Sequence, residues 1–144
     1  MNSRMPTPEE IEELTAFLPL LYADDFQPVE AEQPQGFQAL NSPFYTKVVY
    51  EFFYLLAEEH WADFEYRPKQ SRDMLEDRDA VAQATLAEVR TMLTVCKRGE
   101  NFCSGWWASM IEGGQVRRLL ERLLELNEHG RSVVGHESLD DPSR

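Results

Sequence analysis

Apolar residues recur every three or four positions along several stretches of this chain, which is typical of helices with one buried face. The first stretch begins at Thr7-Pro8-Glu9-Glu10, where a threonine cap, a proline and a glutamate three residues after the cap predict a helix start. Pro19 is expected to kink or end this helix. A second helix is expected to start at Ser42-Pro43. It is apolar on most of its circumference through Leu56, which predicts a central position in the core.

Three further helical patterns follow in the second half of the chain, each with apolar residues on one stripe. Gly99 is expected to end the first of these helices in a left-handed conformation, and Gly113-Gly114 to end the second. The three predicted helices span residues 79–98, 104–112 and 115–129.

Two polar stretches separate these helices, and a third follows them. Residues 23–41 and 62–77 contain prolines and show no steady period, which predicts long connections. Residues 131–144 contain few large apolar side chains and are interpreted as a flexible tail, so a single helical domain is expected over residues 1–130. No alternating apolar and polar run is long enough to predict a strand. The sequence therefore predicts an all-α fold, a compact bundle of about five helices.

The composition is that of one globular domain. A chain of 144 residues can form a core without a metal or a disulfide, and its 42% hydrophobic share is ordinary. No apolar run reaches the roughly 20 residues of a membrane-spanning helix, and Met1-Asn2-Ser3-Arg4 does not resemble a signal peptide. Two cysteines without a secretion signal favour reduced thiols and a cytoplasmic location.

The net charge of −12 is unevenly distributed along the chain. Residues 1–65 contain 13 acidic and two basic side chains, whereas residues 66–144 are nearly balanced. Because nucleic-acid binding draws its affinity from neutralised phosphates, this charge argues against direct nucleic-acid binding. The acidic half is interpreted as a solubilising surface, and the alternative is that it contacts a basic partner.

Residues 97–107, here called the corner, combine two tryptophans with charged residues and two turn glycines between two predicted helices. Trp, Tyr and Arg are the residues that most often dominate binding surfaces, although the same residues would also serve as a structural plug between helices. Consecutive helical residues point about 100° apart, so Trp106 or Trp107 is expected to be exposed. The predicted partner surface comprises Tyr50, Tyr54, Arg98, Glu100, Phe102, Trp106, Trp107 and Arg118.

No residue is predicted to be catalytic, to bind a metal or to hold a cofactor, because the common nucleotide, zinc-hydrolase and serine-hydrolase signatures are absent. Cys96 and Cys103 lack C-x-x-C spacing and a neighbouring histidine, and they are expected to be buried, inert thiols. His60 is expected to be a buried, hydrogen-bonded core residue. Arg117 and Arg118 oppose the dipole of their helix, and we expect nearby glutamates to compensate them or a carboxylate or phosphate to bind there.

The segment Arg98-Gly99-Glu100-Asn101-Phe102-Cys103-Ser104-Gly105 resembles the signature box of an uncharacterised family of small bacterial proteins, a domain of unknown function. In that family the box is similar to Arg-Gly-Glu-Arg-Phe-Cys-Asp-Gly, and a short helix and a leucine-rich helix follow it. This chain differs at Asn101 and Ser104. The resemblance covers most of residues 8–127 and implies a helical bacterial domain, without implying an activity.

These observations favour a non-catalytic protein–protein interaction module that binds its partner through the corner. One alternative is an acidic inhibitor, such as an immunity or anti-defence protein, that blocks a basic nucleic-acid-binding surface of its target. The other is a small-ligand binder or enzyme that uses Arg98, Glu100, Cys103 and His60. The aromatic surface of the second helix is also compatible with a homodimer.

Overall fold

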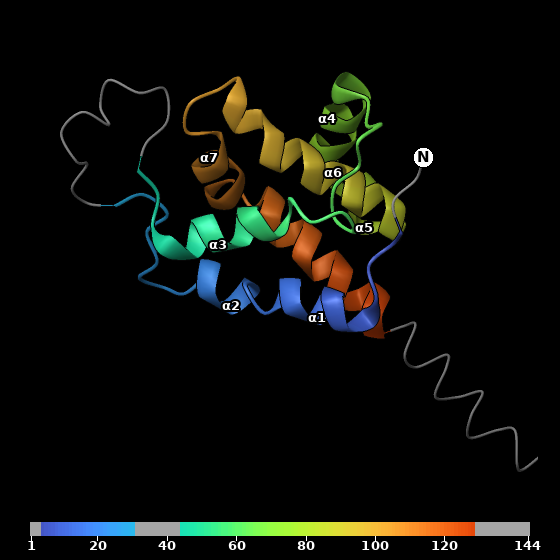
Figure 1. Cartoon of the computed structure of the whole chain (residues 1–144), viewed down its shortest axis with the longest axis horizontal. Coiled ribbons are helices and arrows are strands. Elements are labelled where there is room, and N and C mark those ends of the chain that lie inside the picture. Colours follow the sequence, from blue (N-terminus) through green and yellow to red (C-terminus); the bar gives the residue numbers. More distant parts are fainter. Residues whose placement is uncertain (1–3, 31–43, 129–144) are drawn as a thin grey trace, which may run out of the picture.

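The computed structural model of the chain describes residues 4–30 and 44–128, and over these residues the fold is an all-α bundle, as predicted (Figure 1). Two short helices at the start are followed by a longer aromatic one, and the remaining helices come from the second half of the chain. An isolated bridge between Val29 and Tyr45 is the one β-type pairing among the described residues. The helices are α1 (Pro8–Thr15), α2 (Leu18–Leu21), α3 (Lys47–Leu55), α4 (Pro68–Glu76), α5 (Arg78–Ala82), α6 (Leu86–Arg98), the 3-10 turn η2 (Gly99–Asn101), α7 (Trp106–Glu112) and a helix that starts at residue 115 and is described to residue 128.

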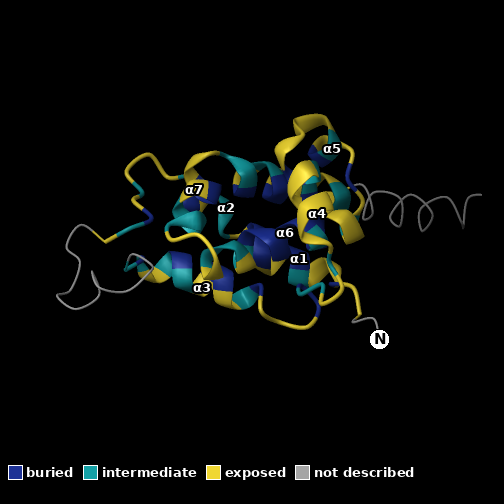
Figure 2. Ribbon diagram, turned by 90° about the horizontal axis from the view of Figure 1, so that it is seen from above, coloured by how far each residue is buried: buried dark blue, intermediate teal, exposed yellow. Residues whose placement is uncertain are grey.

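Two helices form the centre of the bundle. In α6 and in the 115–128 helix, a whole stripe of apolar side chains is buried, whereas α4 and α5 show mostly exposed residues on the outside (Figure 2). The α3 helix adds two phenylalanines, and the turn after it adds a tryptophan that is fully buried. The largest of these core side chains are Phe52, Phe53, Trp61, Met92, Leu93, Leu119, Leu120 and Leu123.

Capping boxes fix where α1 and α6 begin. Thr7 accepts a hydrogen bond from the Glu10 amide while the Glu10 carboxylate accepts one from the Thr7 amide. Thr85 and Glu88 repeat this reciprocal pair at the start of α6. Each pair satisfies two amide groups that have no partner within the helix. The break expected near Pro19 is present, because α1 ends four residues earlier and α2 contains the proline in its first turn.

The start of α1 and the far end of the 115–128 helix meet at one end of the molecule. The Asn127 side-chain amide donates a hydrogen bond of 3.3 Å to the Pro8 carbonyl. Nearby, Arg4 binds the Glu10 carboxylate at 2.6 and 2.7 Å, and the buried Arg90 donates to the Glu59 carbonyl at 3.0 Å. The N-terminal segment and the turn after α3 are thereby tied to the bundle.

Several predicted boundaries are wrong. Residues 62–77 are not a continuous connection, because Pro68–Glu76 forms α4, which buries only Ser71 and Leu75 and so shows little apolar pattern. The single helix predicted over residues 79–98 is two helices, since the Thr85 cap starts α6 anew.

The second predicted helix also starts later than expected. Residues 42–43 lie outside the described residues, but Phe44 and Tyr45 are extended and the helix begins at Lys47, because Tyr45 pairs with Val29 instead. Gly99 is not left-handed (φ −60°). Residues 23–30 are non-helical, as predicted, while residues 31–41 and the predicted tail lie outside the described residues.

Candidate functional site

Glu100 organises the inner side of the corner. Its carboxylate accepts hydrogen bonds from the Tyr45 hydroxyl at 2.9 Å, from the Gly105 amide at 3.1 Å and from the Trp107 amide at 2.8 Å. The last two donors belong to the start of α7, where a negative charge is favoured by the helix dipole. Burial and the neighbouring carboxylate raise the pKa of the Tyr45 phenol, so it remains a donor. Glu100 therefore joins the segment before α3 to α7.

Both corner tryptophans are half-buried, so the expected exposed tryptophan is not present. The Trp107 ring stacks on Phe53, with ring centroids 4.4 Å apart, and its Nε1 donates to the Lys97 carbonyl at 2.9 Å. The Trp106 ring lies against Gly99, where a Cβ would collide with the indole, and the Arg72 guanidinium lies over its face at 5.4 Å. These contacts give the two rings a structural role in packing α7 onto α3 and α6.

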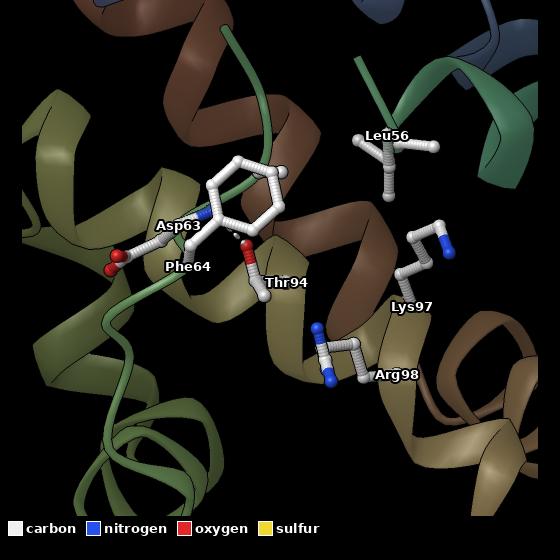
Figure 3. A pocket seen from close by; sticks show the side chains of 8 residues that line it. Leu56, Asp63, Phe64, Thr94, Lys97 and Arg98 are labelled. Atoms are coloured by element: carbon white, nitrogen blue, oxygen red, sulfur yellow. Dashed lines mark hydrogen bonds between the residues drawn. The ribbon is translucent and has the colours of Figure 1, made fainter. Parts of the chain in front are cut away.

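Lys97 and Arg98 line a different side of the corner, here called its outer side, and take no part in the hydrogen bonds to Glu100. The exposed Arg98 guanidinium lies over the Tyr66 ring at 5.6 Å. Both cations line a pocket of about 140 Å³ between the end of α6 and the segment that follows α3 (Figure 3). The ion pairs of the described residues involve other cations and leave out Lys97 and Arg98. The corner thus has a packed inner side and a cationic outer side.

The rest of this pocket is largely apolar. Leu56 and two alanines form its wall, and Phe64 stands at its mouth with 68% of its surface exposed. The Thr94 hydroxyl is already occupied, since it accepts a hydrogen bond from the Asp63 amide at 3.0 Å. The Asp63 carboxylate accepts hydrogen bonds from the Thr91 hydroxyl at 2.7 Å and the Glu65 amide at 3.0 Å. In Figure 3 this carboxylate points away from the space between Leu56 and Phe64.

The structure brings together only part of the predicted partner surface. Tyr50 stacks on Tyr54 and contacts the Trp107 ring, which places these residues on the α3 side of the corner. Tyr54 and Phe102 are exposed by 64% and 81%, respectively. Arg118 does not belong to the corner, because it lines a separate groove beside α5.

The histidine lies beside Glu10 rather than beside the corner charges, and the two thiols differ in burial. Cys96 is buried, as predicted, and burial raises its pKa to about 12, but Cys103 is exposed in the turn before α7, so its predicted burial is wrong. The burial of His60 is confirmed, but the predicted hydrogen bond of its side chain is not found among the described residues. Its Nδ1 lies 3.7 Å from the Glu10 carboxylate, and its Nε2 has no hydrogen-bond partner within the described residues. The geometry therefore does not support an enzyme built from Arg98, Glu100, Cys103 and His60.

Within the described ranges, no group of three or more His, Cys, Asp or Glu side chains is placed to hold a metal ion. Among the helices of those same ranges, none combines the length and the apolar character needed to cross a bilayer.

A family model matches residues 6–129, which includes the corner, the pocket and all of the described helices. The chain belongs to DUF6508, a family of unknown function. The expectation of an uncharacterised family is confirmed, and membership assigns no activity, substrate or partner. No curated protein and no solved structure matches the chain.

Lys97 and Phe64 are not among the binding residues that the sequence predicts. A lysine in the last turn of a helix is commonly explained by the helix dipole alone. Phe64 belongs to residues 62–77, which the sequence predicts to be a connection. Its neighbour Asp63 bonds to Thr91 and Thr94 of α6, and this tertiary contact brings the aromatic ring beside the cations.

Proposed function

We propose that the chain is a non-catalytic protein-binding module that binds an acidic segment of another protein on the outer side of the corner. The observation that carries this proposal is the pocket in which Lys97 and Arg98 stand beside an apolar wall and the exposed Phe64 ring. The proposal retains the cytoplasmic location expected from the reduced thiols.

The size of the pocket supports a side chain as its occupant. Pockets that hold drug-sized molecules have volumes of roughly 300–1,000 Å³, and this one has about 140 Å³. One apolar side chain from the partner would fill it, with Leu56 on one side and Phe64 on the other. A buried apolar anchor surrounded by a polar rim is the usual arrangement of a binding hot spot.

The charge of the rim supports an acidic partner. In a chain of net charge −12, two cations without an ion pair among the described residues stand side by side. A carboxylate on either side of the partner's apolar residue would lie near the guanidinium and the ammonium group. Such pairs accelerate association and select the partner by charge.

The test is selection from a random 12-residue peptide library displayed on phage, using the full chain as bait. We expect enriched peptides in which acidic residues flank one large apolar residue. The double variant Lys97→Gln/Arg98→Gln is expected to bind these peptides at least tenfold more weakly, which corresponds to about 1.4 kcal/mol.

The matched control is Lys47→Gln/Lys69→Gln, which removes the same charge from two exposed positions on α3 and α4. This control is expected to bind like the wild type. Circular dichroism verifies that each variant is folded. Enriched peptides without acidic residues, or equal affinity for the Lys97→Gln/Arg98→Gln variant, would contradict the proposal.

A further inference from the structure

Three arginines line a groove between α5 and the 115–128 helix. This groove has no lining residue in common with the corner pocket. Arg78 is the first residue of α5, and Arg118 and Arg122 lie one helical turn apart on the facing helix. The groove has a volume of about 210 Å³, and Val81 and Ala82 supply an apolar wall. This concentration of guanidinium groups stands out in a chain of net charge −12.

The glutamates at the rim of this groove are already engaged. The Glu121 carboxylate accepts a hydrogen bond from Arg117 Nε at 3.3 Å, and Arg117 does not line the groove. The Glu125 carboxylate binds the Arg122 guanidinium at 3.1 Å, and Arg122 Nε donates to the Ala84 carbonyl at 2.9 Å. Arg122 is thus held in place with its charge paired. The two rim glutamates are paired with Arg117 and Arg122, and neither forms an ion pair with Arg78 or Arg118.

Arg118 and Arg78 take no part in the ion pairs of the described residues. Arg118 Nε is sealed from solvent and has no hydrogen-bond partner within the same residues. Arg118 also stands in the first turn of its helix, where the helix dipole is positive and a cation is unfavourable. An anion in the groove would supply the charge partner that the guanidinium groups of Arg78 and Arg118 lack among the described residues.

We propose that this groove binds the phosphate group of a small phosphomonoester. Guanidinium groups bind phosphate oxygens through two parallel hydrogen bonds, and two unpaired guanidinium groups suit a dianion. The volume of about 210 Å³ is below that of drug-sized sites, so the ligand carries only a small organic part, which packs on Val81 and Ala82. This site is independent of the proposed protein-binding function, because neither Lys97 nor Arg98 contributes to it.

The experiment is a titration of the ¹⁵N-labelled full chain with glycerol 3-phosphate at constant ionic strength, followed by amide chemical shifts. We expect saturable one-to-one shifts in residues 78–82 and 118–125. Because the second phosphate pKa is about 6, the affinity should rise between pH 5.5 and pH 7.5, whereas sulfate should bind with no such rise. Non-saturating shifts, or shifts of equal size with chloride, would overturn the proposal.

Variants decide which groups bind the ligand. Arg118→Gln and Arg78→Gln are each expected to weaken glycerol 3-phosphate at least tenfold, while Lys69→Gln, an exposed cation of α4 outside the groove, stays within twofold of the wild type. If Arg118→Gln does not fold, Arg78→Gln decides, since that residue is exposed. Unchanged affinity in Arg78→Gln would overturn the proposal. A phosphoserine peptide that binds tenfold more tightly than glycerol 3-phosphate would overturn the small-molecule assignment and indicate a phosphorylated protein.

Discussion

Glu100→Ala is expected to be among the most destabilising substitutions of a partly exposed residue in this protein. The carboxylate accepts three hydrogen bonds, two from amides at the start of α7 and one from the Tyr45 hydroxyl, which belongs to a residue only 2% exposed. The substitution removes both carboxylate oxygens, so all three donors lose their acceptor at once. The Tyr45 hydroxyl then remains in an environment that water reaches poorly, and α7 loses the anion at its positive end.

The expected loss follows from these contacts. A hydrogen bond to a charged group contributes about 1.5–3 kcal/mol, and removing a helix cap costs about 1 kcal/mol. Because the three bonds share one carboxylate, their energies do not add in full, and we expect a loss of about 3–5 kcal/mol. Domains of this type are stable by only about 5–15 kcal/mol. With a shift of about 2–4 °C per kcal/mol, the melting temperature should fall by about 10 °C.

The assay is urea unfolding followed by circular dichroism at 222 nm, with a graded set of variants. Glu100→Gln keeps one acceptor oxygen but replaces the other with an NH₂ group, which cannot accept a hydrogen bond. This variant should therefore lose about half as much stability as Glu100→Ala. Tyr45→Phe removes a single donor and should cost about 1 kcal/mol. In the double variant with Glu100→Ala, the Tyr45→Phe change should cost less than it does alone, since its partner is already gone.

Glu112→Ala is the matched control, because it removes an exposed carboxylate from the opposite end of α7. Its effect should stay within about 0.5 kcal/mol of the wild type. If Glu100→Ala also stays within about 0.5 kcal/mol at an unchanged denaturant slope, the carboxylate does not hold the corner together and the reasoning is refuted.

Three further predictions concern single side chains. Gly99→Ala places a methyl group against the Trp106 indole and should lower the free energy of unfolding in urea by about 1–3 kcal/mol. An unchanged midpoint would show that the ring moves freely. In the native protein, iodoacetamide should modify Cys103 but not Cys96, whose raised pKa of about 12 and burial keep it a protected thiol; two modified thiols by mass spectrometry would contradict this. Hydrogen bonds from Arg4 and from the Thr7 amide lower the pKa of Glu10 to about 2. The pairing of Glu10 therefore stabilises the fold above a pH of about 4, and this stabilisation is lost as the pH falls toward 2. Arg4→Gln should return the NMR-measured pKa of Glu10 toward about 4.

Local signals in the sequence account for most of the fold. The Thr7 capping box was recognised, and α1 starts where it predicts. The same signature occurs at Thr85 and Glu88 and marks the start of α6, so the break in the predicted 79–98 helix was available from the sequence. By contrast, α4 buries only two side chains and adds one half-buried methionine, and its stability comes from packing on α6 rather than from a long apolar stripe.

The candidate site was less predictable because its residues meet through tertiary contacts. Glu100 and Trp107 were identified as corner residues, but their role depends on Tyr45, which arrives from the segment before α3. The late start of α3 has the same origin, since the pairing of Tyr45 with Val29 keeps that segment extended. The position of Phe64 beside Lys97 likewise depends on hydrogen bonds between distant segments, which no local pattern encodes.

The hydrogen bond between Asn127 and Pro8 has a practical consequence for protein engineering. The first and the last described helices meet side by side, at the end of the molecule opposite the corner turn and α7 (Figure 1). A short linker from residue 128 back to residue 4 would therefore close the domain into a ring, and the chain could be reopened at an exposed turn such as the one between α4 and α5. Fluorophores or immobilisation tags attached at this end would leave both the outer side of the corner and the α7 cap free for measurement.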